Sequence, residues 1–329
     1  MSDFTQADRA FRVDTPLGED VLLLEGFSGQ EAMSSPFRFT LELLSKDDGI
    51  DPTGVLEQPV LVSMRLADGS DRYFHGFVSR FVQLGKSEDL TSYEAEMVPW
   101  LWFMSLSRDC KVFQQKTVLE IVEEVFSEYG NADFTNNCVQ SYPSREYCVQ
   151  YRESDLNFVS RLLEEEGIYY YFEHTSDGHT LTLIDDMSLI QPCPVQSTFE
   201  VTGSPEGWLD EDVIIQLQWE HVVNSGRITL RDYDYLQPSN NLEASRGGEG
   251  LEVYDYPGRY AEVAEGERYA DILLEEERVD QQTLRGSSSC RTMSTGYSFD
   301  LSGYYAESAN QNYVLTGCWH TARGGGYRS

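Results

Sequence analysis

The chain has 329 residues, 40% of them hydrophobic and 12% aromatic, which is ample for two or three folded domains and argues against intrinsic disorder. Its 56 acidic and 24 basic residues give a net charge of −32, and no lysine follows Lys116. This balance argues against nucleic acid or an anionic membrane surface as a partner, because binding either requires a basic patch. It fits either a generally acidic, salt-adapted proteome or electrostatic matching to a basic partner.

The first residues, MSDFTQADRAF, are polar and acidic and contain no apolar core of the kind that a signal peptide requires. The sequence contains no run of 18 apolar residues, so no membrane-spanning helix and no membrane anchor is expected. Six cysteines are scattered without a CxxC pair, which predicts reduced thiols in a cytoplasmic chain. These are Cys110, Cys138, Cys148, Cys193, Cys290 and Cys318.

The stretch up to about Pro99 alternates apolar and polar residues. Every second side chain is apolar in Phe37–Leu43, and Val60–Leu66 repeats the pattern. Such alternation is typical of strands with one buried face, and Asp68-Gly69 is typical of a hairpin turn. With three further runs, five or six antiparallel strands are predicted. A closed barrel is the expected product, because closure removes exposed edges.

The period then changes from two to that of a helix. Val118–Tyr129 places apolar residues on one helical face. Thr117 and Glu120 have the Thr-x-x-Glu spacing of a capping box, and Gly130 supplies the residue that often ends a helix. A helix is therefore predicted directly after Thr117.

A second helix is predicted near residues 154–166. Ser154 can cap its start, and Gly167 ends it. The β-branched and aromatic run Ile168–Phe172 then predicts a strand. Ser176-Asp177-Gly178 predicts the turn of a hairpin that extends to about residue 185.

Strand-like alternation returns in the last third of the chain. Val213–Val223 alternates over eleven positions, the longest such run in the sequence. Asn224-Ser225-Gly226 predicts a turn that pairs this run with Arg227–Tyr235 as a hairpin. Residues 237–259 are rich in Gly, Pro and Asn and predict a loop, and a third helix is expected at about 265–279.

These patterns predict a mainly β fold with an α+β insertion, built from two similar antiparallel β-barrel domains. The first barrel covers 1–104, the inserted α/β domain 105–186 and the second barrel 187–329. The second barrel carries a loop-plus-helix insertion at about 236–285. Its late strands are expected near Tyr297–Leu301 and Tyr313–Trp319, and whether its final strand is present is left open.

Several strings, taken in order, resemble the VgrG proteins, the spike of the type VI secretion system, in the module that corresponds to the baseplate hub of contractile phage tails. The string REYCVQYRESDLNFVSRLLEEEGIYYYF at 145–172 carries the resemblance most clearly. The match covers nearly the whole chain, which makes it specific where one string would be weak. The other landmarks are Phe27–Phe39, Tyr73–Val78, Pro99–Gln114, Tyr256–Tyr260 and Gly286–Cys290.

The resemblance implies a phage baseplate hub fold and a homotrimer, in which six similar barrels present pseudo-sixfold symmetry to a hexameric tube. The implied partners are the tube protein, haemolysin-coregulated protein, and baseplate proteins. It also implies assembly in the cytoplasm and secretion without a signal peptide when the sheath contracts. Such spikes continue past the hub into a further barrel and a β-helix, through which effectors and a spike-tip protein bind. Those parts are absent from this sequence, so whether the hub forms a trimer without them is left open.

Paired carboxylates would be needed for glycoside hydrolysis, with the two groups about 5 to 9 Å apart. Glu164, Glu165 and Glu166 form the densest cluster, but adjacent helical residues point in different directions. A solvated face or an interface is therefore the preferred interpretation. The same reasoning applies to Glu275, Glu276 and Glu277.

No metal or cofactor site is predicted. His174 and His179 flank a turn and could approach each other, but no third ligand has a recognisable spacing. The other histidines, His75, His221 and His320, are isolated on expected strands. All five are interpreted as structural or surface residues.

Two runs of small residues could be taken for a nucleophile and for a phosphate-binding loop. Gly-x-Ser-x-Gly is absent, so Ser287–Cys290 is interpreted as a tight strand entry rather than as a nucleophile. The glycines Gly247, Gly248 and Gly250 lack the strand-then-helix frame of a phosphate-binding loop and are interpreted as flexible. Neither run predicts chemistry.

Aromatic strings at Trp100–Phe103 and Tyr169–Phe172 could stack bases or sugars, but without basic residues between them core or subunit packing is preferred. No catalytic, cofactor-binding or metal residue is therefore predicted. The expected function is a non-enzymatic structural hub of a type VI secretion spike. The alternatives are the hub or late-control protein of a contractile phage tail or related particle and, from another class, a baseplate-associated glycoside hydrolase.

Overall fold

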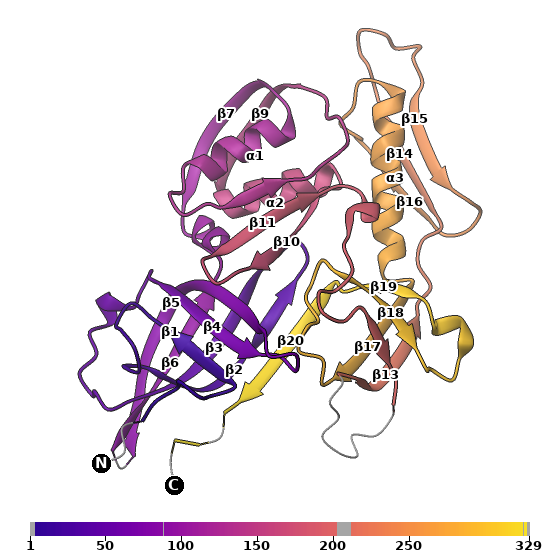
Figure 1. Cartoon of the computed structure of the whole chain (residues 1–329). Helices are drawn as coiled ribbons and strands as arrows, with labels where there is room; N and C mark the ends of the chain where they lie inside the picture. The colour runs from indigo at the N-terminus through magenta and orange to yellow at the C-terminus, as the bar shows by residue number, and fades with distance from the viewer. Residues whose placement is uncertain (1–3, 88, 203–211, 325, 328–329) are drawn as a thin grey trace.

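A computed structural model describes residues 4–87, 89–202, 212–324 and 326–327. Its largest element is a seven-stranded antiparallel sheet in the order β1-β4-β5-β6-β3-β2-β20, which curls into a half-barrel (Figure 1). In the described residues β1 does not pair with β20, so the sheet does not close as the sequence suggested. The strands are β1 Phe11–Asp14, β2 Leu23–Ala32, β3 Ser35–Ser45, β4 Pro59–Arg65, β5 Asp71–Ser87, β6 Leu90–Val98 and β20 Gly317–Arg323.

Alternation along β3 builds the core of this sheet. Phe37, Phe39 and Leu41 are each no more than 1% exposed, whereas Arg38 between them is exposed. The predicted turn at Asp68-Gly69 joins β4 to β5, and Gly69 has the positive φ that favours glycine. The mainly β fold with an α+β insertion is confirmed. The exact limits of the three predicted domains stay a prediction.

The last strand of the half-barrel, β20, comes from the far end of the chain. Tyr313–Trp319 was predicted to lie in the second barrel, and this was wrong for its latter part. Strand β20 pairs with β2, with His320 opposite Gly29 and Cys318 opposite Glu31. Only β19, Asn312–Val314, stays with the C-terminal strands. Alternation shows that a segment is a strand, but it does not show which edge the strand joins.

The inserted unit follows the predicted order. The helices α1, Val118–Ser127, and α2, Asp155–Glu165, begin at the predicted caps, and Thr117 and Glu120 form both hydrogen bonds of a capping box. Figure 1 shows the helices between two small sheets. One pairs β7, Arg108–Lys116, with β9, Arg145–Ser154; the other contains β10, Tyr169–His174, β11, His179–Ile184, and β8, Phe134–Asn136.

The inserted unit shares one continuous core with the half-barrel. Trp100, which is 2% exposed, packs edge-on against Phe126 of α1 with ring centroids 5.0 Å apart. Its indole N–H donates to the carbonyl of Asp133 at 3.1 Å. The aromatic strings therefore pack in the core at Trp100 and at Tyr170–Phe172, as the sequence predicted.

The C-terminal region contains three small sheets among its described residues, and here two predictions were wrong. The run β13, Ile214–His221, pairs with β17, Gln282–Ser288, and not with the strand that follows it. That strand, β14 Arg227–Asp232, pairs instead with β15 Leu242–Gly247 and β16 Glu252–Asp255. Both β15 and β16 lie in the stretch 237–259 that was predicted as loop. The third sheet contains β12 Thr198–Glu200, β18 Ser298–Ser302 and β19.

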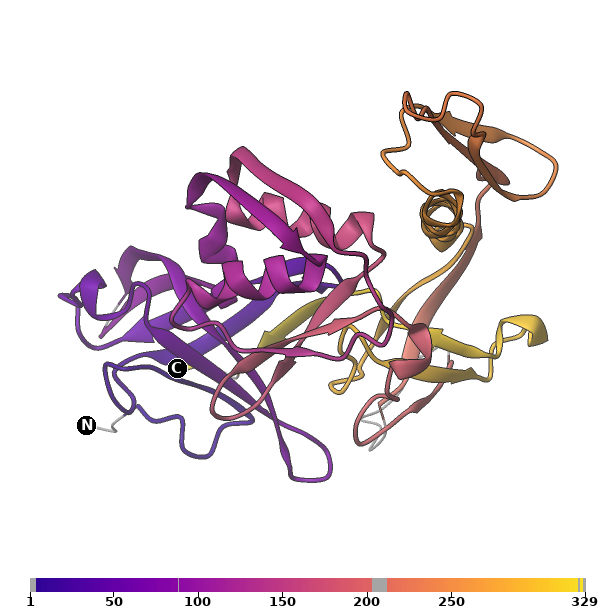
Figure 2. The same ribbon diagram turned by 90° about the horizontal axis from the view of Figure 1, so that it is seen from above.

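Helix α3, Val263–Val279, covers one face of the β15-β14-β16 sheet. Ala270 and Leu274 of the helix pack against Ile228 and Leu230 of β14. Seen from above, this unit stands apart from the half-barrel (Figure 2). None of the described helices is long and apolar enough to cross a membrane.

Candidate functional site

The acidic cluster at the end of α2 links two units of the protein. Glu164 is exposed, but the side chain of Glu166 is 1% exposed and pairs with Arg145 of β9 and with Arg268 of α3. Glu165 also pairs with Arg145, at 2.8 Å. The sequence favoured either a solvated face or an interface for this cluster, and Glu166 lies at an interface, between β9 and α3. The carboxylates Glu275 and Glu276 lie exposed on α3.

Three histidines meet where β5 of the half-barrel contacts the β10–β11 hairpin. His75 was expected to be isolated, but its Nδ1 lies 2.9 Å from Nδ1 of His179. The rings of His174 and His179 approach across the turn, with centroids 6.0 Å apart, as predicted. The place of His75 in this cluster was not predicted, because a contact between residues 104 positions apart leaves no signal in the spacing of the sequence.

Backbone donors fix the proton on two of these rings. The Trp100 N–H donates to Nε2 of His179 at 3.1 Å, so neutral His179 carries its hydrogen on Nδ1 and donates it to His75. The His75 N–H donates to Nδ1 of His174 at 3.1 Å. Burial lowers the pKa of His75, lowers that of His174 to about 4, and lowers that of His179 well below its usual range. A proton added to His174 or His179 would face a backbone N–H.

A second buried polar cluster joins the half-barrel to the C-terminal region. Arg72 of β5 pairs with Glu31 of β2 at 3.4 Å and donates to Ser294 Oγ at 2.7 Å and to the carbonyl of Arg291. His320 of β20 lies 2.8 Å from the same Glu31 oxygen. The side chains of Arg72 and Glu31 are 11% and 3% exposed. We call these residues the junction cluster.

The charges of the junction cluster are settled by their neighbours. Burial alone would raise the pKa of Glu31, but the hydrogen bond from His320 and the positive charge of Arg72 lower it. Burial lowers the pKa of His320, so its neutral ring donates Nε2–H to the carboxylate. Glu31 is therefore a buried carboxylate whose single full counter-charge is Arg72.

The junction cluster also contains the ligand types of a transition-metal site. One ligand atom each from Glu31, Cys318 and His320 lies within 4.8 Å of the others. A divalent ion there would stand beside the Arg72 guanidinium, which already neutralises Glu31, and burial raises the pKa of the Cys318 thiol to about 12. This arrangement is that of an internal ion pair.

The remaining candidates are structural. Ser289 Oγ accepts from the Val213 N–H at 3.1 Å, and burial raises the pKa of the neighbouring Cys290 thiol to about 12, which keeps it protonated. Gly247 has φ +93°, and a Cβ there would lie 2.1 Å from the Gly226 carbonyl oxygen. This glycine serves a close approach of two strands, and no phosphate-binding loop is formed around it.

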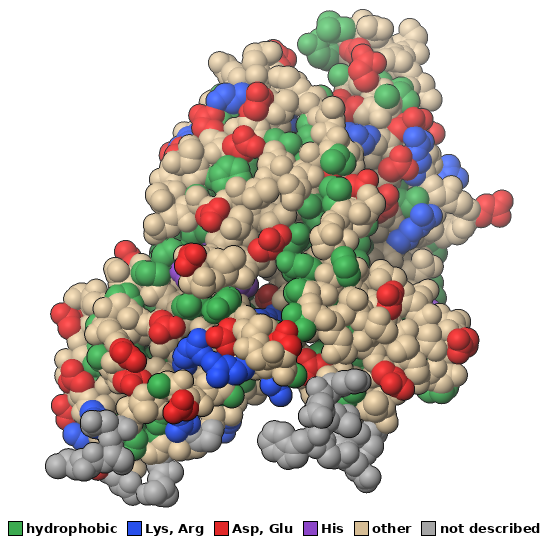
Figure 3. All heavy atoms as spheres, viewed as in Figure 1, with side chains coloured by type: hydrophobic (Ala, Val, Ile, Leu, Met, Phe, Trp, Pro, Cys, Tyr) green, Lys and Arg blue, Asp and Glu red, His purple; other side chains and the backbone are tan. Residues whose placement is uncertain are grey.

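One exposed face is formed mainly by uncharged side chains, with the Arg152 guanidinium carbon 5.1 Å from the ring centroid of Tyr151 at one end. The outer side of the β7–β9 sheet presents Val112 opposite Val149 and Cys110 opposite Tyr151, and Tyr147 continues it. Val112, Tyr147 and Tyr151 are 63%, 65% and 63% exposed. On the side of the molecule drawn in Figure 3, acidic side chains are scattered over every unit. We call the outer side of β7–β9 the uncharged face.

Residues 30–326 match the family model of the phage tail baseplate hub (GPD). The chain is 36% identical to the type VI secretion system spike protein VgrG1b of Pseudomonas aeruginosa over 95% of its own length and 43% of the relative's. VgrG1a of the same organism is 34% identical over 95% of this chain and 50% of its own length. The chain thus spans about half the length of these curated relatives.

Solved structures agree on the fold. An E. coli protein, c3393, described as a component of the type VI secretion system with structural similarity to the T4 tail proteins gp27 and gp5, matches with a TM-score of 0.73 and 24% identity. The match covers 95% of this chain and 73% of c3393. A 43 kDa tail protein of prophage MuSo2 from Shewanella oneidensis matches with a TM-score of 0.68 and 9% identity, over 95% and 94% of the two chains.

Proposed function

This chain belongs to the phage tail baseplate hub family, where its sequence is similar to that of the VgrG spikes, and we propose that it is the non-enzymatic structural hub of a type VI secretion spike. In this proposal three copies form a ring that adapts a hexameric tube to a threefold spike. The ring assembles in the cytoplasm and is expelled when the sheath contracts, helping to deliver effectors. Its implied partners are the tube protein and baseplate proteins.

The observation that carries the proposal is the way the units are locked together. Strand β20 ties the C-terminal region to the half-barrel, and Arg72 reaches from β5 to the carbonyl of Arg291. Glu166 ties α2 to α3. An adaptor under mechanical load must keep its contact surfaces in fixed relative positions, and buried cross-links of this kind serve that need.

A chain with a net charge of −32 repels its own copies, so assembly requires contact through surfaces that add no further repulsion. The uncharged face meets this condition, and we propose that it contacts a second copy of this chain. A phage tail hub, the alternative, would share the fold. Sequence identity favours the spike, because this chain is more than 30% identical to secretion spike proteins but 9% identical to the prophage tail protein.

The solution mass of the chain tests the proposal directly. Light scattering is expected to show a species near three times 37.5 kDa, and its fraction is expected to rise with salt. Salt has this effect because at about 0.1 M the Debye length is only about 10 Å and repulsion between copies is screened. The hexameric tube protein is then added, and a larger complex is expected. A monomer at every salt concentration would contradict trimer formation by this chain.

Placing a charge on the uncharged face should weaken assembly. Val112→Glu is expected to lower the assembled fraction at a given salt concentration by about tenfold or more in association constant, because a buried unpaired carboxylate costs several kcal/mol. The matched control is Val112→Thr, which keeps the β-branched shape and adds no charge. Sedimentation velocity measures both. Equal assembly of the two variants would remove the uncharged face from the interface.

A glycoside hydrolase makes the opposite prediction about turnover. The carboxylates of the two acidic clusters are neutralised or exposed: Glu165 and Glu166 both pair with Arg145, and Glu275 and Glu276 are exposed on one helix. The hub proposal predicts no release of soluble fragments from peptidoglycan by this chain alone. Turnover by the purified chain would favour the enzyme.

A further inference from the structure

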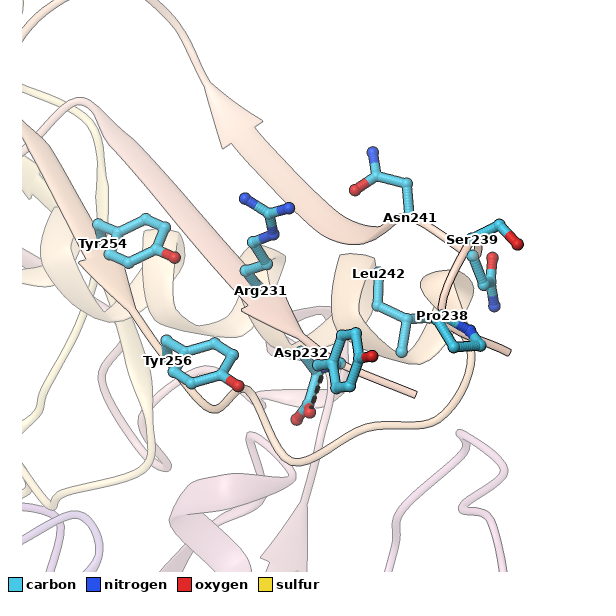
Figure 4. Close-up of a pocket in the computed structure, with 10 residues that line it drawn as sticks. Arg231, Asp232, Pro238, Ser239, Asn241, Leu242, Tyr254 and Tyr256 are labelled. Carbon is cyan, nitrogen blue, oxygen red and sulfur yellow. Dashed lines mark hydrogen bonds between the residues drawn. The ribbon is translucent and has the colours of Figure 1, made fainter. Parts of the chain in front are cut away.

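A cavity of about 490 Å³ opens on the β15-β14-β16 sheet, close to the loop between β14 and β15 (Figure 4). Its volume lies within the range of about 300–1,000 Å³ that is usual for small-molecule sites. It is distinct from the junction cluster, the histidine cluster and the uncharged face, because it is lined only by residues between Arg231 and Tyr256.

Two tyrosines form one wall. Tyr254 lies on β16 opposite Thr229, and Tyr256 follows two residues later, so both side chains leave the same side of the strand. They are 56% and 55% exposed. Figure 4 shows the two rings side by side, with Arg231 between them and Asn241. The cavity therefore offers two aromatic surfaces beside a guanidinium and an amide.

The polar groups of the cavity are available for a ligand. Within the described part of the chain, the side chains of Arg231, Ser239 and Asn241 have no hydrogen-bond or ion-pair partner. Arg231 stands opposite Glu243 in the strand register without forming an ion pair with it. Asp232 has a different task, because its carboxylate accepts from the backbone N–H groups of Tyr233 and Arg259 and so shapes the rim.

The sheet explains why these groups stay uncommitted. Ile228 and Leu230 pack under α3 on the other face, which supplies the apolar burial that this unit needs, and Leu242 belongs both to this core and to the lining of the cavity. Residues at alternate positions, Thr229 and Arg231, consequently face away from the helix. Arg231 is thus left out of the packing against α3.

The chemistry of the cavity fits a sugar. Exposed tyrosine rings provide flat surfaces for the C–H faces of pyranose rings, and the fork of Arg231 and the amide of Asn241 can bind adjacent hydroxyls. Asp232 and Glu243 lie beside Arg231, and the whole chain carries −32, so a polyanionic ligand would be repelled. We propose that this cavity binds an uncharged oligosaccharide.

The test uses the whole chain and four tetrasaccharide probes. Chitotetraose, cellotetraose and maltotetraose are uncharged, and tetragalacturonate is the acidic counterpart. Isothermal titration and saturation-transfer NMR are expected to show binding of at least one uncharged probe, with Kd at or below roughly 1 mM, and weaker binding of tetragalacturonate. Binding needs no assembly of the chain, so it is read independently of the hub proposal.

Variants locate the site. Tyr256→Ala and Arg231→Gln are each expected to weaken binding by about tenfold or more. The matched controls lie in the same unit outside the cavity: Tyr235→Ala, at 77% exposure, and Arg278→Gln, at the exposed end of α3, should change Kd less than about twofold. Thermal unfolding checks that each variant folds. The proposal is overturned by absence of binding of every uncharged probe at about 10 mM, by tighter binding of tetragalacturonate, or by equal losses in the control variants.

Discussion

Replacing Arg72 with methionine is expected to lower the free energy of unfolding by roughly 3–5 kcal/mol, because it leaves Glu31 buried without a full counter-charge. The carboxylate is 3% exposed, and its other partner, His320, is held neutral. Methionine retains the packing of the arginine stem on the ring of Phe74, over which the guanidinium carbon lies 4.4 Å from the ring centroid. Urea unfolding, followed by circular dichroism, measures the loss.

Two further variants separate the buried ion pair from arginine loss in general. Arg80→Met removes an arginine whose side chain is 56% exposed and pairs with Glu94, and it should cost no more than about 1 kcal/mol. Combining Arg72→Met with Glu31→Gln removes the orphaned charge and should restore part of the loss. A loss from Arg72→Met as small as that from Arg80→Met would show that the junction cluster contributes little to stability.

Mild acid should destabilise the protein through the histidine cluster. His174 has a folded pKa of about 4 against an ordinary value of about 6.5, so the unfolded state binds more protons between these values. Its stabilising contribution is complete above about pH 6.5 and is lost as pH falls toward 4. The slope is about 1.4 kcal/mol per pH unit for each such histidine, and His174 alone accounts for up to about 3 kcal/mol. Unfolding curves at a series of pH values measure it.

A non-titrating substitute isolates one group. In His174→Gln the amide oxygen can still accept from the His75 N–H, and the pH dependence below 6.5 is expected to become shallower by the share of one proton. His221→Gln is the control, because His221 is exposed on β13 and touches none of the cluster. Parallel pH profiles for wild type and His174→Gln would contradict the assignment.

Acid should also weaken the junction cluster, since the pKa of Glu31 is lowered in the fold and its contribution to stability disappears when the carboxylate is protonated.

Local signals predicted local structure well. The capping box at Thr117, the cap at Ser154 and the turn at Asp68-Gly69 all lie where the sequence placed them. Each of these features is decided within a few residues, by orphan amides that need acceptors or by a backbone conformation that only certain residues adopt. The turn predicted at Asn224-Ser225-Gly226 is an irregular connection instead: β13 ends at His221, but the chain does not fold back on it as a hairpin.

Periodicity in the sequence did not predict which strands pair with partners far away along the chain. In β13 most side chains on the inner side are only half-buried, so the sequence of the strand gives no strong signal of which strand it pairs with. Its partner, β17, also lies about 60 residues further along the chain. The alternating run at β20 would suit either sheet. The junction cluster was missed for this reason: Glu31 and Cys318 become neighbours only when β2 and β20 pair.

The side-chain clusters were likewise predicted only where their members lie close together in the sequence. The approach of His174 and His179 was predicted because a hairpin turn separates them, whereas His75 and His320 gain their partners through tertiary packing. The cavity beside Tyr254 and Tyr256 was hidden because its strands lie in a stretch whose Gly, Pro and Asn content predicted a loop. Composition described the turns of that stretch and masked the short strands between them.

The pairing of β20 with β2 has a consequence for synthesis on the ribosome. Strands β1 to β6 are complete once residue 98 has emerged, but the outer edge of β2 gains its partner only with residues 317–323. Until then a row of unpaired amides and carbonyls is exposed and can recruit strands from other nascent chains. Productive folding of this protein therefore depends on keeping that edge shielded while the intervening residues are made, and the half-barrel reaches its final form only after residues 317–323 have been synthesised.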